Sequence, residues 1–282
     1  MALHPPADPL ETYHPDLFRD TVTLVTGGGT GIGRATAAAF ARLGSTLVLA
    51  GRRADVLEET AADLRASFGS PVLAVPTNIR EPAQVEALRD AAYGEFGRVD
   101  TLVNNAGGQF PVLPSQLSDN GWRSVVDLNL NGTWTMLNRF MEPMVQAGGG
   151  TIVTMVHTYV FDRGARFFVH SGAARAGVLS MTRTMASFLA PHGVTVNAIA
   201  PGLIDTSGMR EHEGEAVEAM DLDSLGQLGL KVTRRMGTTE EVAAGIVWLA
   251  SPAARYVTGT VLVVDGGLVL DNWPDPWERD AY

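Results

Sequence analysis

Two side chains that could share one reaction site stand four residues apart near the middle of the chain. Ser171 and Arg175 lie in the stretch His-Ser-Gly-Ala-Ala-Arg-Ala-Gly-Val at 170–178, at the start of a helical pattern. Residues i and i+4 share one face of a helix, so both side chains can point into one cleft. The Arg175 guanidinium donates hydrogen bonds but does not exchange protons at neutral pH, and the Ser171 hydroxyl is a poor acid. The pair therefore predicts hydrogen bonding to a bound group without a strong proton donor.

Two histidines precede this pair in the sequence. His157 and His170 have side chains that titrate near neutrality, so either could take part in proton transfer. Each could equally be an ordinary polar residue whose ring nitrogens are satisfied by backbone groups. The residue types alone leave both interpretations open.

A glycine-rich turn near the N-terminus predicts a nucleotide site. The segment Thr-Gly-Gly-Gly-Thr-Gly-Ile-Gly at 26–33 follows an apolar strand pattern and precedes a helix. The glycines let the backbone turn tightly and approach a pyrophosphate, and the helix N-terminus supplies unpaired N–H groups. In this strand–turn–helix context a purely structural turn is the weaker interpretation. The predicted contacts are Gly27, Gly29, Thr30, Gly31, Ile32 and Gly33.

The end of the second predicted strand bears on which dinucleotide is bound. An acid there would bind the ribose 2′-hydroxyl of NAD, but the chain reads Leu-Ala-Gly-Arg-Arg at 49–53. Arg52, with Arg53 beside it, can fork onto a 2′-phosphate, and Arg34 could contribute. The alternative is two solvated arginines at the start of a helix. The missing acid favours NADP(H).

The elements that must position these residues alternate regularly: apolar strand patterns are followed by Ala- and Leu-rich helical patterns. Expected strands are 21–26, 46–50, 72–76, 101–104, 151–156, 194–198 and 260–264, with helices such as 32–43, 55–67 and 81–96 between them. Such alternation predicts an α/β fold in which a parallel sheet is covered on both faces. We expect a single-domain Rossmann fold with a seven-stranded parallel sheet and helices on both faces.

The domain organisation is predicted from the same pattern. Residues 1–20, with four prolines, form an N-terminal arm; 21–267 form the Rossmann domain; and 268–282 form a C-terminal tail. The polar, glycine-punctuated stretch 206–236 breaks this alternation after a strand end, where ligands bind in such folds. It is predicted to be a substrate loop or lid, with a plain surface excursion as the alternative.

Composition excludes several functions. The chain has 282 residues, a net charge of −10 and no basic run, which disfavours nucleic-acid and membrane partners. It has no cysteine, which rules out disulfides and thiolate-bound metals, and no metal site is predicted. It has neither a membrane-spanning apolar run nor a secretion signal, so we expect a cytoplasmic protein.

Further motifs, together with the glycine-rich turn, resemble those of a known protein family. Asn104-Asn-Ala-Gly107, Pro201-Gly-Leu-Ile-Asp-Thr206 and Val264-Asp-Gly-Gly267 follow the glycine-rich turn in order. Together they resemble the short-chain dehydrogenase/reductase family over roughly 21–267. The resemblance implies further cofactor contacts from Asn78, Ile79, Asn105, Ala106, Gly107, Arg175, Pro201, Gly202, Ile204 and Thr206.

The resemblance also shows what the catalytic site has lost. The family carries Tyr-x-x-x-Lys where this chain has Ser171 and Arg175, and its usual Ser is replaced at 156–157 by Val-His. The family's helix asparagine is matched by Asn129, whose implied role is to hold a helix kink and a water chain. His157 stands at the edge of the implied site and is counted among its candidate catalytic residues.

A subgroup of the family matches these departures. Peroxisomal-type trans-2-enoyl-CoA reductases and 2,4-dienoyl-CoA reductases lack tyrosine at position 171, and this chain resembles them at 78–80, 107–110, 170–178 and 271–274. In the dienoyl reductases a catalytic tyrosine follows the fifth strand, and Tyr159 stands about there. This resemblance makes Tyr159 the first candidate donor and Ser171 the second. Tyr159 as a plain aromatic is the alternative.

The predicted function is NADPH-dependent reduction of an activated C=C bond, with an enoyl thioester as substrate and hydride delivered to its β-carbon. Charge then builds on the thioester oxygen, which requires hydrogen-bond donors more than a strong acid. Since 206–236 is acidic, the substrate could be a carrier-protein thioester or a small free molecule. Alternatives are a ketone or imine reductase with a relocated acid, and a cofactor-binding scaffold. Family analogy suggests a homotetramer packed through helices near 120–146 and 171–190.

Overall fold

A seven-stranded parallel sheet forms the centre of the protein. The computed structural model describes residues 8–161, 164, 167–206, 233 and 235–270. The strands are β1 (Val22–Thr26), β2 (Thr46–Gly51), β3 (Val72–Pro76), β4 (Thr101–Asn104), β5 (Gly150–Met155), β6 (Val194–Pro201) and β7 (Val261–Val264). Their order across the sheet is β3-β2-β1-β4-β5-β6-β7, and every neighbouring pair is parallel. The predicted fold class is confirmed.

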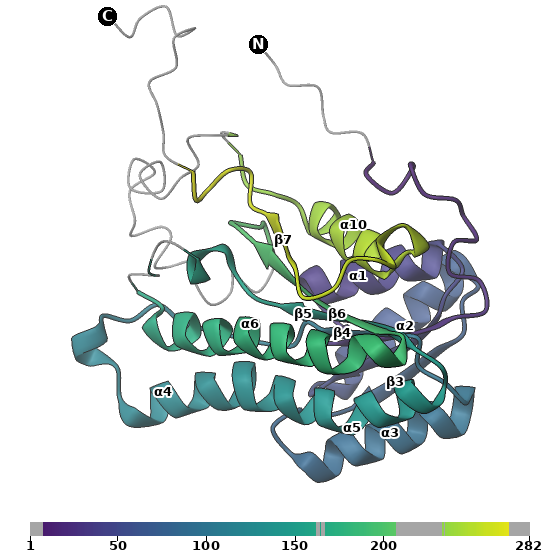
Figure 1. The fold of residues 1–282 in the computed structure, drawn as a ribbon, viewed down its shortest axis with the longest axis horizontal. Coiled ribbons are helices and arrows are strands. Elements are labelled where there is room, and N and C mark those ends of the chain that lie inside the picture. The colour runs from purple at the N-terminus through teal and green to yellow at the C-terminus, as the bar shows by residue number, and fades with distance from the viewer. Residues whose placement is uncertain (1–7, 162–163, 165–166, 207–232, 234, 271–282) are drawn as a thin grey trace, which may run out of the picture.

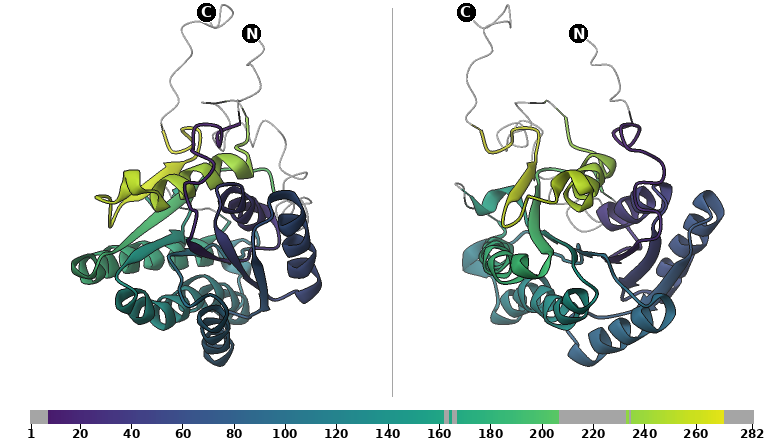
Figure 2. Two further views of the ribbon diagram at one scale, coloured as in Figure 1. Left: turned by 90° about the vertical axis from the view of Figure 1, so that its right-hand side faces the viewer. Right: turned by 45° about the vertical axis from the view of Figure 1, so that its right-hand side comes forward.

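Helices cover both faces of this sheet. The described helices are α1 (Gly31–Arg42), α2 (Ala54–Phe68), α3 (Pro82–Phe96), α4 (Asp119–Val126), the π-helical turn η2 (Asp127–Asn131), α5 (Gly132–Gln146), α6 (Val169–Leu189) and α10 (Thr239–Ala250). Short 3₁₀ turns are η1 (Pro114–Gln116), η3 (Thr158–Val160), η4 (Ala190–His192) and η6 (Pro252–Ala254). In Figures 1 and 2, α1 and α10 lie on one side of the sheet, and α3, α5 and α6 lie on the other.

Two large apolar cores result, one on each face of the sheet, and a third, smaller cluster lies between α6 and β6. Neighbouring residues of β4 divide between them: Val103 packs into the core with α1 and α10, and Leu102 packs into the core with α5 and α6. Successive strand residues point to opposite faces, so a strand buried on both sides must be apolar at nearly every position. Each fully buried aliphatic side chain contributes roughly 1.5–3 kcal/mol of transfer free energy.

Two boundaries differ from the predicted ones for identifiable reasons. β6 continues past Ala198 to Pro201 because it pairs with β7 as far as the Pro201–Val264 position. The long helix expected near 120–146 is interrupted by the π turn η2 at Asp127–Asn131. An inserted residue of this kind shifts the register of the side chains that follow and is frequent at functional sites.

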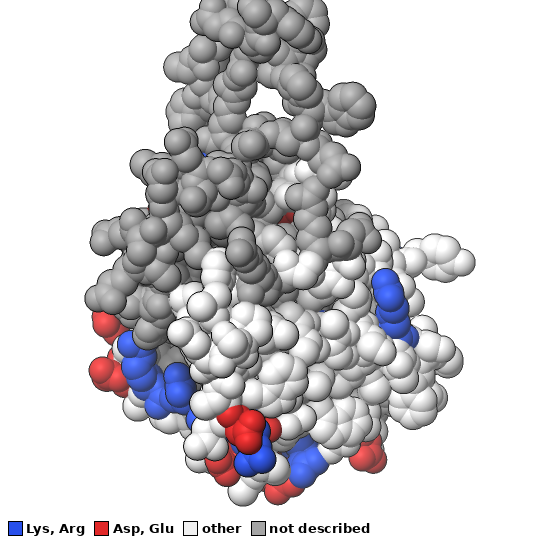
Figure 3. Space-filling model, turned by 90° about the vertical axis from the view of Figure 1, so that its left-hand side faces the viewer, with Lys and Arg blue, Asp and Glu red and all other residues white. Residues whose placement is uncertain are grey.

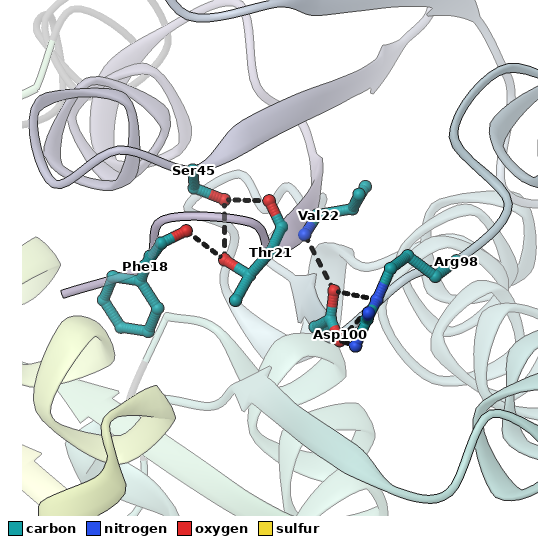
Figure 4. Close-up of polar contacts among 6 residues, drawn as sticks. All are labelled: Phe18, Thr21, Val22, Ser45, Arg98 and Asp100. Atoms are coloured by element: carbon teal, nitrogen blue, oxygen red, sulfur yellow. Dashed lines mark hydrogen bonds and ion pairs between the residues drawn. The ribbon is translucent and has the colours of Figure 1, made fainter. Parts of the chain in front are cut away.

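Polar groups hold the amino ends of the central strands together (Figure 4). The Thr21 hydroxyl lies 3.3 Å from the Ser45 hydroxyl and donates to the Phe18 carbonyl at 2.6 Å. Asp100 accepts the Val22 N–H at 2.8 Å and pairs with the Arg98 guanidinium. These bonds align β1, β2 and β4 at the end opposite the glycine-rich turn, so their role is structural.

The described part of the predicted N-terminal arm packs on the domain. Phe18 is buried with its ring centroid 4.7 Å from that of Phe40 in α1, and the Tyr13 hydroxyl donates to the Ala244 carbonyl of α10. The predicted lid at 206–236 lies almost entirely outside the described residues, as do 271–282 of the tail. The division into arm, domain, lid and tail remains a prediction.

Candidate active site

A cavity of about 310 Å³ opens at the carboxyl ends of β1, β2 and β4. This is where the strand order reverses, and dinucleotides bind at such a switch point in parallel α/β sheets. Predicted cofactor residues that line it are Gly27, Gly29, Thr30, Gly31, Ile32, Gly33, Arg52, Arg53, Asn78, Ile79, Asn105, Ala106, Gly107 and Thr206. It is also lined by Ala50, Gly51, Val56, Leu57, Thr77 and Leu128, which the sequence reasoning missed. Ala50, Gly51 and Thr77 lie at the ends of β2 and β3, whereas Val56, Leu57 and Leu128 lie in α2 and η2, and no sequence motif marks any of them.

The glycine-rich turn makes a backbone cradle at one side of this cavity. Gly27 has φ +67°, in the left-handed region that favours glycine. A Cβ at Gly33 would stand 2.1 Å from the Gly27 carbonyl oxygen, so only glycine allows α1 to start this close to the turn. The N-cap Thr30 makes no side-chain cap bond, which leaves the first N–H groups of α1 available. This cradle fits a pyrophosphate.

The end of the cavity nearest β2 carries two exposed arginines. Arg52 and Arg53 form no ion pair within the described ranges, and they immediately precede α2. Arg34, in contrast, pairs with Asp63 at 2.6 Å and does not line the cavity. Arg52 and Arg53 thus remain the candidate phosphate site, whereas Arg34 forms an ion pair with Asp63.

Arg175 lies buried at the opposite end, beside the Asn-Ala-Gly turn. Its side chain is 7% exposed, and Nη1 donates to the Met155 carbonyl at 2.5 Å. A Cβ at Gly107 would stand 2.0 Å from Arg175 Nη2, so the guanidinium rests against this glycine. No carboxylate in the part of the chain that the structure describes pairs with it. Burial lowers the pKa of Arg175 to about 10, which still leaves it charged at neutral pH.

Asn129 fixes the loop that carries Gly107. It is fully buried in the π turn η2, where Oδ1 accepts the Gly108 N–H at 3.1 Å and Nδ2 donates to the Gly108 carbonyl at 2.8 Å. Two bonds from one amide hold this backbone in a single orientation. The structure therefore shows that Asn129 clamps the loop under Arg175.

His157 and Tyr159 follow β5 and lie near Arg175. Both ring nitrogens of His157 are buried without a partner in the described chain. Desolvation, together with the Arg175 charge, lowers the pKa of His157 to about 4, so its imidazole is neutral at pH 7. The Tyr159 ring stands edge-to-face to it, with centroids 5.8 Å apart. The structure thus brings Tyr159, His157 and Arg175 into one neighbourhood.

Ser171 and His170 lie in the first turn of α6, about one turn before Arg175. Ser171 is 1% exposed, and its N–H donates to Nδ1 of the fully buried His170 at 2.8 Å. Desolvation lowers the pKa of His170, an effect that the nearby backbone of Phe168 and Phe110 partly opposes. The Phe110 ring packs edge-to-face on this imidazole at 4.7 Å. His170 therefore anchors the start of the helix that carries Ser171.

The carboxyl ends of β6 and β7 form the side of the site away from the cavity. The Thr158 hydroxyl donates to Asp265 Oδ2 at 2.7 Å, and Gly202 packs directly against Asp265. Four predicted cofactor contacts do not line the cavity: Pro201, Gly202, Ile204 and Arg175. The Thr158–Asp265 bond, which sequence reasoning missed, ties the loop after β5 to the turn after β7.

The surface around the carboxyl ends of the strands is poor in charge. Figure 3 shows the described part of this face as mostly uncharged, with most of its acidic and basic side chains along the lower rim. Phe110, Leu113 and Val169 are all more than a third exposed here. Neither a metal-binding cluster of His, Cys, Asp or Glu nor a helix suited to crossing a membrane occurs among the described residues.

Comparisons with known proteins agree with this geometry. Residues 27–269 match the family model described as enoyl-(acyl carrier protein) reductase. The chain is 38% identical to a peroxisomal 2,4-dienoyl-CoA reductase of Pongo abelii (92% of this chain, 87% of that protein). It is 37% identical to a probable 2,4-dienoyl-CoA reductase of Bacillus subtilis (89% and 97%).

Solved structures show the same similarity. A citronellol catabolism dehydrogenase of Pseudomonas aeruginosa PAO1 is 37% identical with a TM-score of 0.77, covering 91% of this chain and 98% of that one. L-Sorbose reductase of Gluconobacter frateurii, solved with NADPH and L-sorbose, is 28% identical with a TM-score of 0.83, covering 92% and 100%.

Proposed function

This chain belongs to the short-chain dehydrogenase/reductase family, and on that premise we propose that it reduces an activated C=C bond of an enoyl thioester with NADPH. The family makes it a nicotinamide-dependent oxidoreductase. The observation that carries the finer proposal is the buried guanidinium of Arg175, which pairs with no carboxylate among the described residues and lies one helical turn after Ser171, the position where the family carries its tyrosine. The relatives named as 2,4-dienoyl-CoA reductases support the thioester substrate.

The proposed chemistry places its main demand on hydrogen-bond donors. The bound cofactor supplies the hydride for the β-carbon of the substrate. Negative charge then develops on the thioester oxygen, and donors already oriented in a site of low dielectric stabilise it without reorganisation. A proton from Tyr159 or from water then adds to the α-carbon and completes the reduction. A ketone reductase must instead protonate an alkoxide directly, which requires a positioned acid. Ser171 cannot meet that requirement, but it can donate a hydrogen bond.

We assign roles to the chain's own residues on this basis. Tyr159 is the candidate donor to the oxygen, with Ser171 as the second donor and neutral His157 contributing an N–H or accepting one. Arg175 supplies fixed positive charge near the oxygen, and Asn129 positions the loop at Gly108. Burial of Ser171, Arg175 and Asn129 strengthens the electrostatic interactions of these three side chains.

The cofactor is proposed to be NADP(H) rather than NAD(H). The two exposed arginines at the end of β2 have no acidic partner in the chain that the structure describes, and no acid follows β2 to bind a ribose 2′-hydroxyl. A guanidinium pairs well with a phosphate. Arg52→Gln should weaken binding of NADPH but leave binding of NADH nearly unchanged.

The proposal is tested with purified enzyme, NADPH and trans-2-enoyl-CoA substrates of several chain lengths, each also offered on an acyl carrier protein. We expect the reduced-nicotinamide absorbance to fall with at least one of them, and Tyr159→Phe to reduce turnover while cofactor affinity is unchanged. Turnover of ketones or imines only would favour the carbonyl-type alternative. Cofactor binding without turnover on either panel would favour a scaffold role.

We also propose that the protein assembles as a homotetramer. Trp122 on α4, Trp134 on α5 and Phe188 on α6 are 38%, 45% and 61% exposed, which supports packing of these helices against other copies. Sedimentation velocity of the full chain tests this, and a monomer would contradict it.

A further inference from the structure

We propose that Arg175 makes the site bind the reduced nicotinamide cofactor more tightly than the oxidised one, so that a mixture of the two forms loads the enzyme with the reduced one. The inference rests on the proposed dinucleotide site but on no particular substrate. It follows from the position of Arg175, from the lack of a paired carboxylate among the described residues and from the charge difference between the two cofactor forms.

The first step concerns position. The cavity runs from Arg52 and Arg53 past the glycine cradle to Gly107 and Leu128. A dinucleotide held with its phosphates on the cradle and its adenosine end at the arginines must place its nicotinamide half toward Gly107. Arg175 Nη2 rests against that same glycine. The guanidinium is thus at the redox end of the site.

The second step concerns compensation. The polar groups around Arg175 within the described chain are neutral: the Asn129 amide, the Met155 carbonyl and the His157 imidazole. Asp265 accepts hydrogen bonds from Thr158 and from the turn backbone, and it forms no ion pair with Arg175 among the described residues. Because the guanidinium is buried, water and salt screen its field weakly. A full positive charge therefore acts on this end of the site.

The third step concerns the ligand. The oxidised nicotinamide ring carries one positive charge and the reduced ring carries none, while the rest of the cofactor is the same in both forms. Arg175 repels only the oxidised ring. Ser171, at the position where the family carries a phenol, does not ionise to offset this repulsion. Differential affinity for two forms of a ligand shifts their equilibrium on the protein by the same factor, so bound cofactor is favoured as the reduced form.

The test measures binding without any substrate. Dissociation constants of NADPH and NADP⁺, and of NADH and NAD⁺, are determined by calorimetry for the wild type and for Arg175→Gln. We expect the wild type to bind the reduced form at least about tenfold more tightly, and this ratio to fall at least about fivefold in Arg175→Gln, as expected for a charge acting through a partly buried medium. Circular dichroism checks that the variant is folded, and Arg175→Met replaces it if it is not.

Two matched variants separate charge from shape. Arg175→Lys keeps the charge and should keep most of the preference. Arg52→Gln should weaken the reduced and oxidised phosphorylated forms equally, because both carry the same 2′-phosphate. An unchanged ratio in Arg175→Gln, or a lysine variant that loses the ratio as the glutamine variant does, would overturn the proposal. The result is independent of whether enoyl thioesters are turned over, so the two proposals can fail separately.

Discussion

The two ends of the candidate site are built in opposite ways. At the cradle end, backbone N–H groups and missing side chains make the binding surface, as at Gly33, where a Cβ would meet the Gly27 carbonyl at 2.1 Å. At the redox end, buried side-chain atoms form the binding surface. Among the described residues, Arg175 and His157 have few hydrogen-bond partners, whereas Oδ1 and Nδ2 of Asn129 are both hydrogen-bonded to Gly108. The cradle is determined by local conformation, and the redox end by which segments meet.

This contrast predicts different responses to substitution. Adding atoms should damage the cradle, because its function depends on empty space. Removing or neutralising groups should alter the redox end, because its function depends on desolvated polar atoms whose free energies depend on their neighbours.

The largest expected effect is at the cradle. Gly33→Ala should weaken cofactor binding by more than about 100-fold, since the new Cβ forces α1 away from the turn that holds the pyrophosphate. Gly94→Ala is the matched control: Gly94 lies in α3 with nothing near its Cβ position, and its replacement should leave binding intact and add about 0.5–1 kcal/mol of stability. Calorimetric titration and thermal unfolding measure both, and normal affinity in Gly33→Ala would refute the role of close approach.

A smaller effect is expected at the clamp between the ends. Asn129→Ala leaves the Gly108 N–H and carbonyl without partners, so it should cost about 2–3 kcal/mol of stability. Displacement of the loop should lower turnover roughly 30-fold, while cofactor affinity changes much less. Asn131→Ala removes an exposed amide bonded to Asp127 and serves as the control. Equal kinetics in the two variants would show that Asn129 does not position the loop.

The smallest effect is the pH response of the redox end. The folded-state pKa of His157 is about 4, below its unfolded value of about 6.5. The unfolded chain therefore binds the proton first as pH falls. The stability contributed by the neutral ring is complete above about pH 6.5 and is lost progressively toward pH 4. Relative to His157→Gln, the wild type should lose roughly 2 kcal/mol over this range in urea unfolding. Parallel pH profiles would contradict the buried, neutral imidazole.

The predictability of the site follows the same division. The glycine spacing at 26–33, the arginines at 52–53 and the Asn-Ala-Gly turn at 105–107 were predicted from sequence, and they line the cavity. The redox end was predicted only in outline. Ser171 and Arg175 were placed on one helix face by their spacing, and both are buried there. Arg34 was also considered as a phosphate ligand, but it forms an ion pair with Asp63 on α2 and does not line the cavity.

By itself, the sequence determined the parallel sheet with its covering helices and the backbone cradle. Apolar strand runs and glycines act through their immediate neighbours, so their consequences can be derived from local patterns. Only the tertiary structure decided that Asn129 grips Gly108, that the nitrogens of His157 are buried and that Arg175 has no carboxylate beside it in the described chain. Desolvation and charge pairing depend on segments distant in sequence, and no spacing rule records which of them meet.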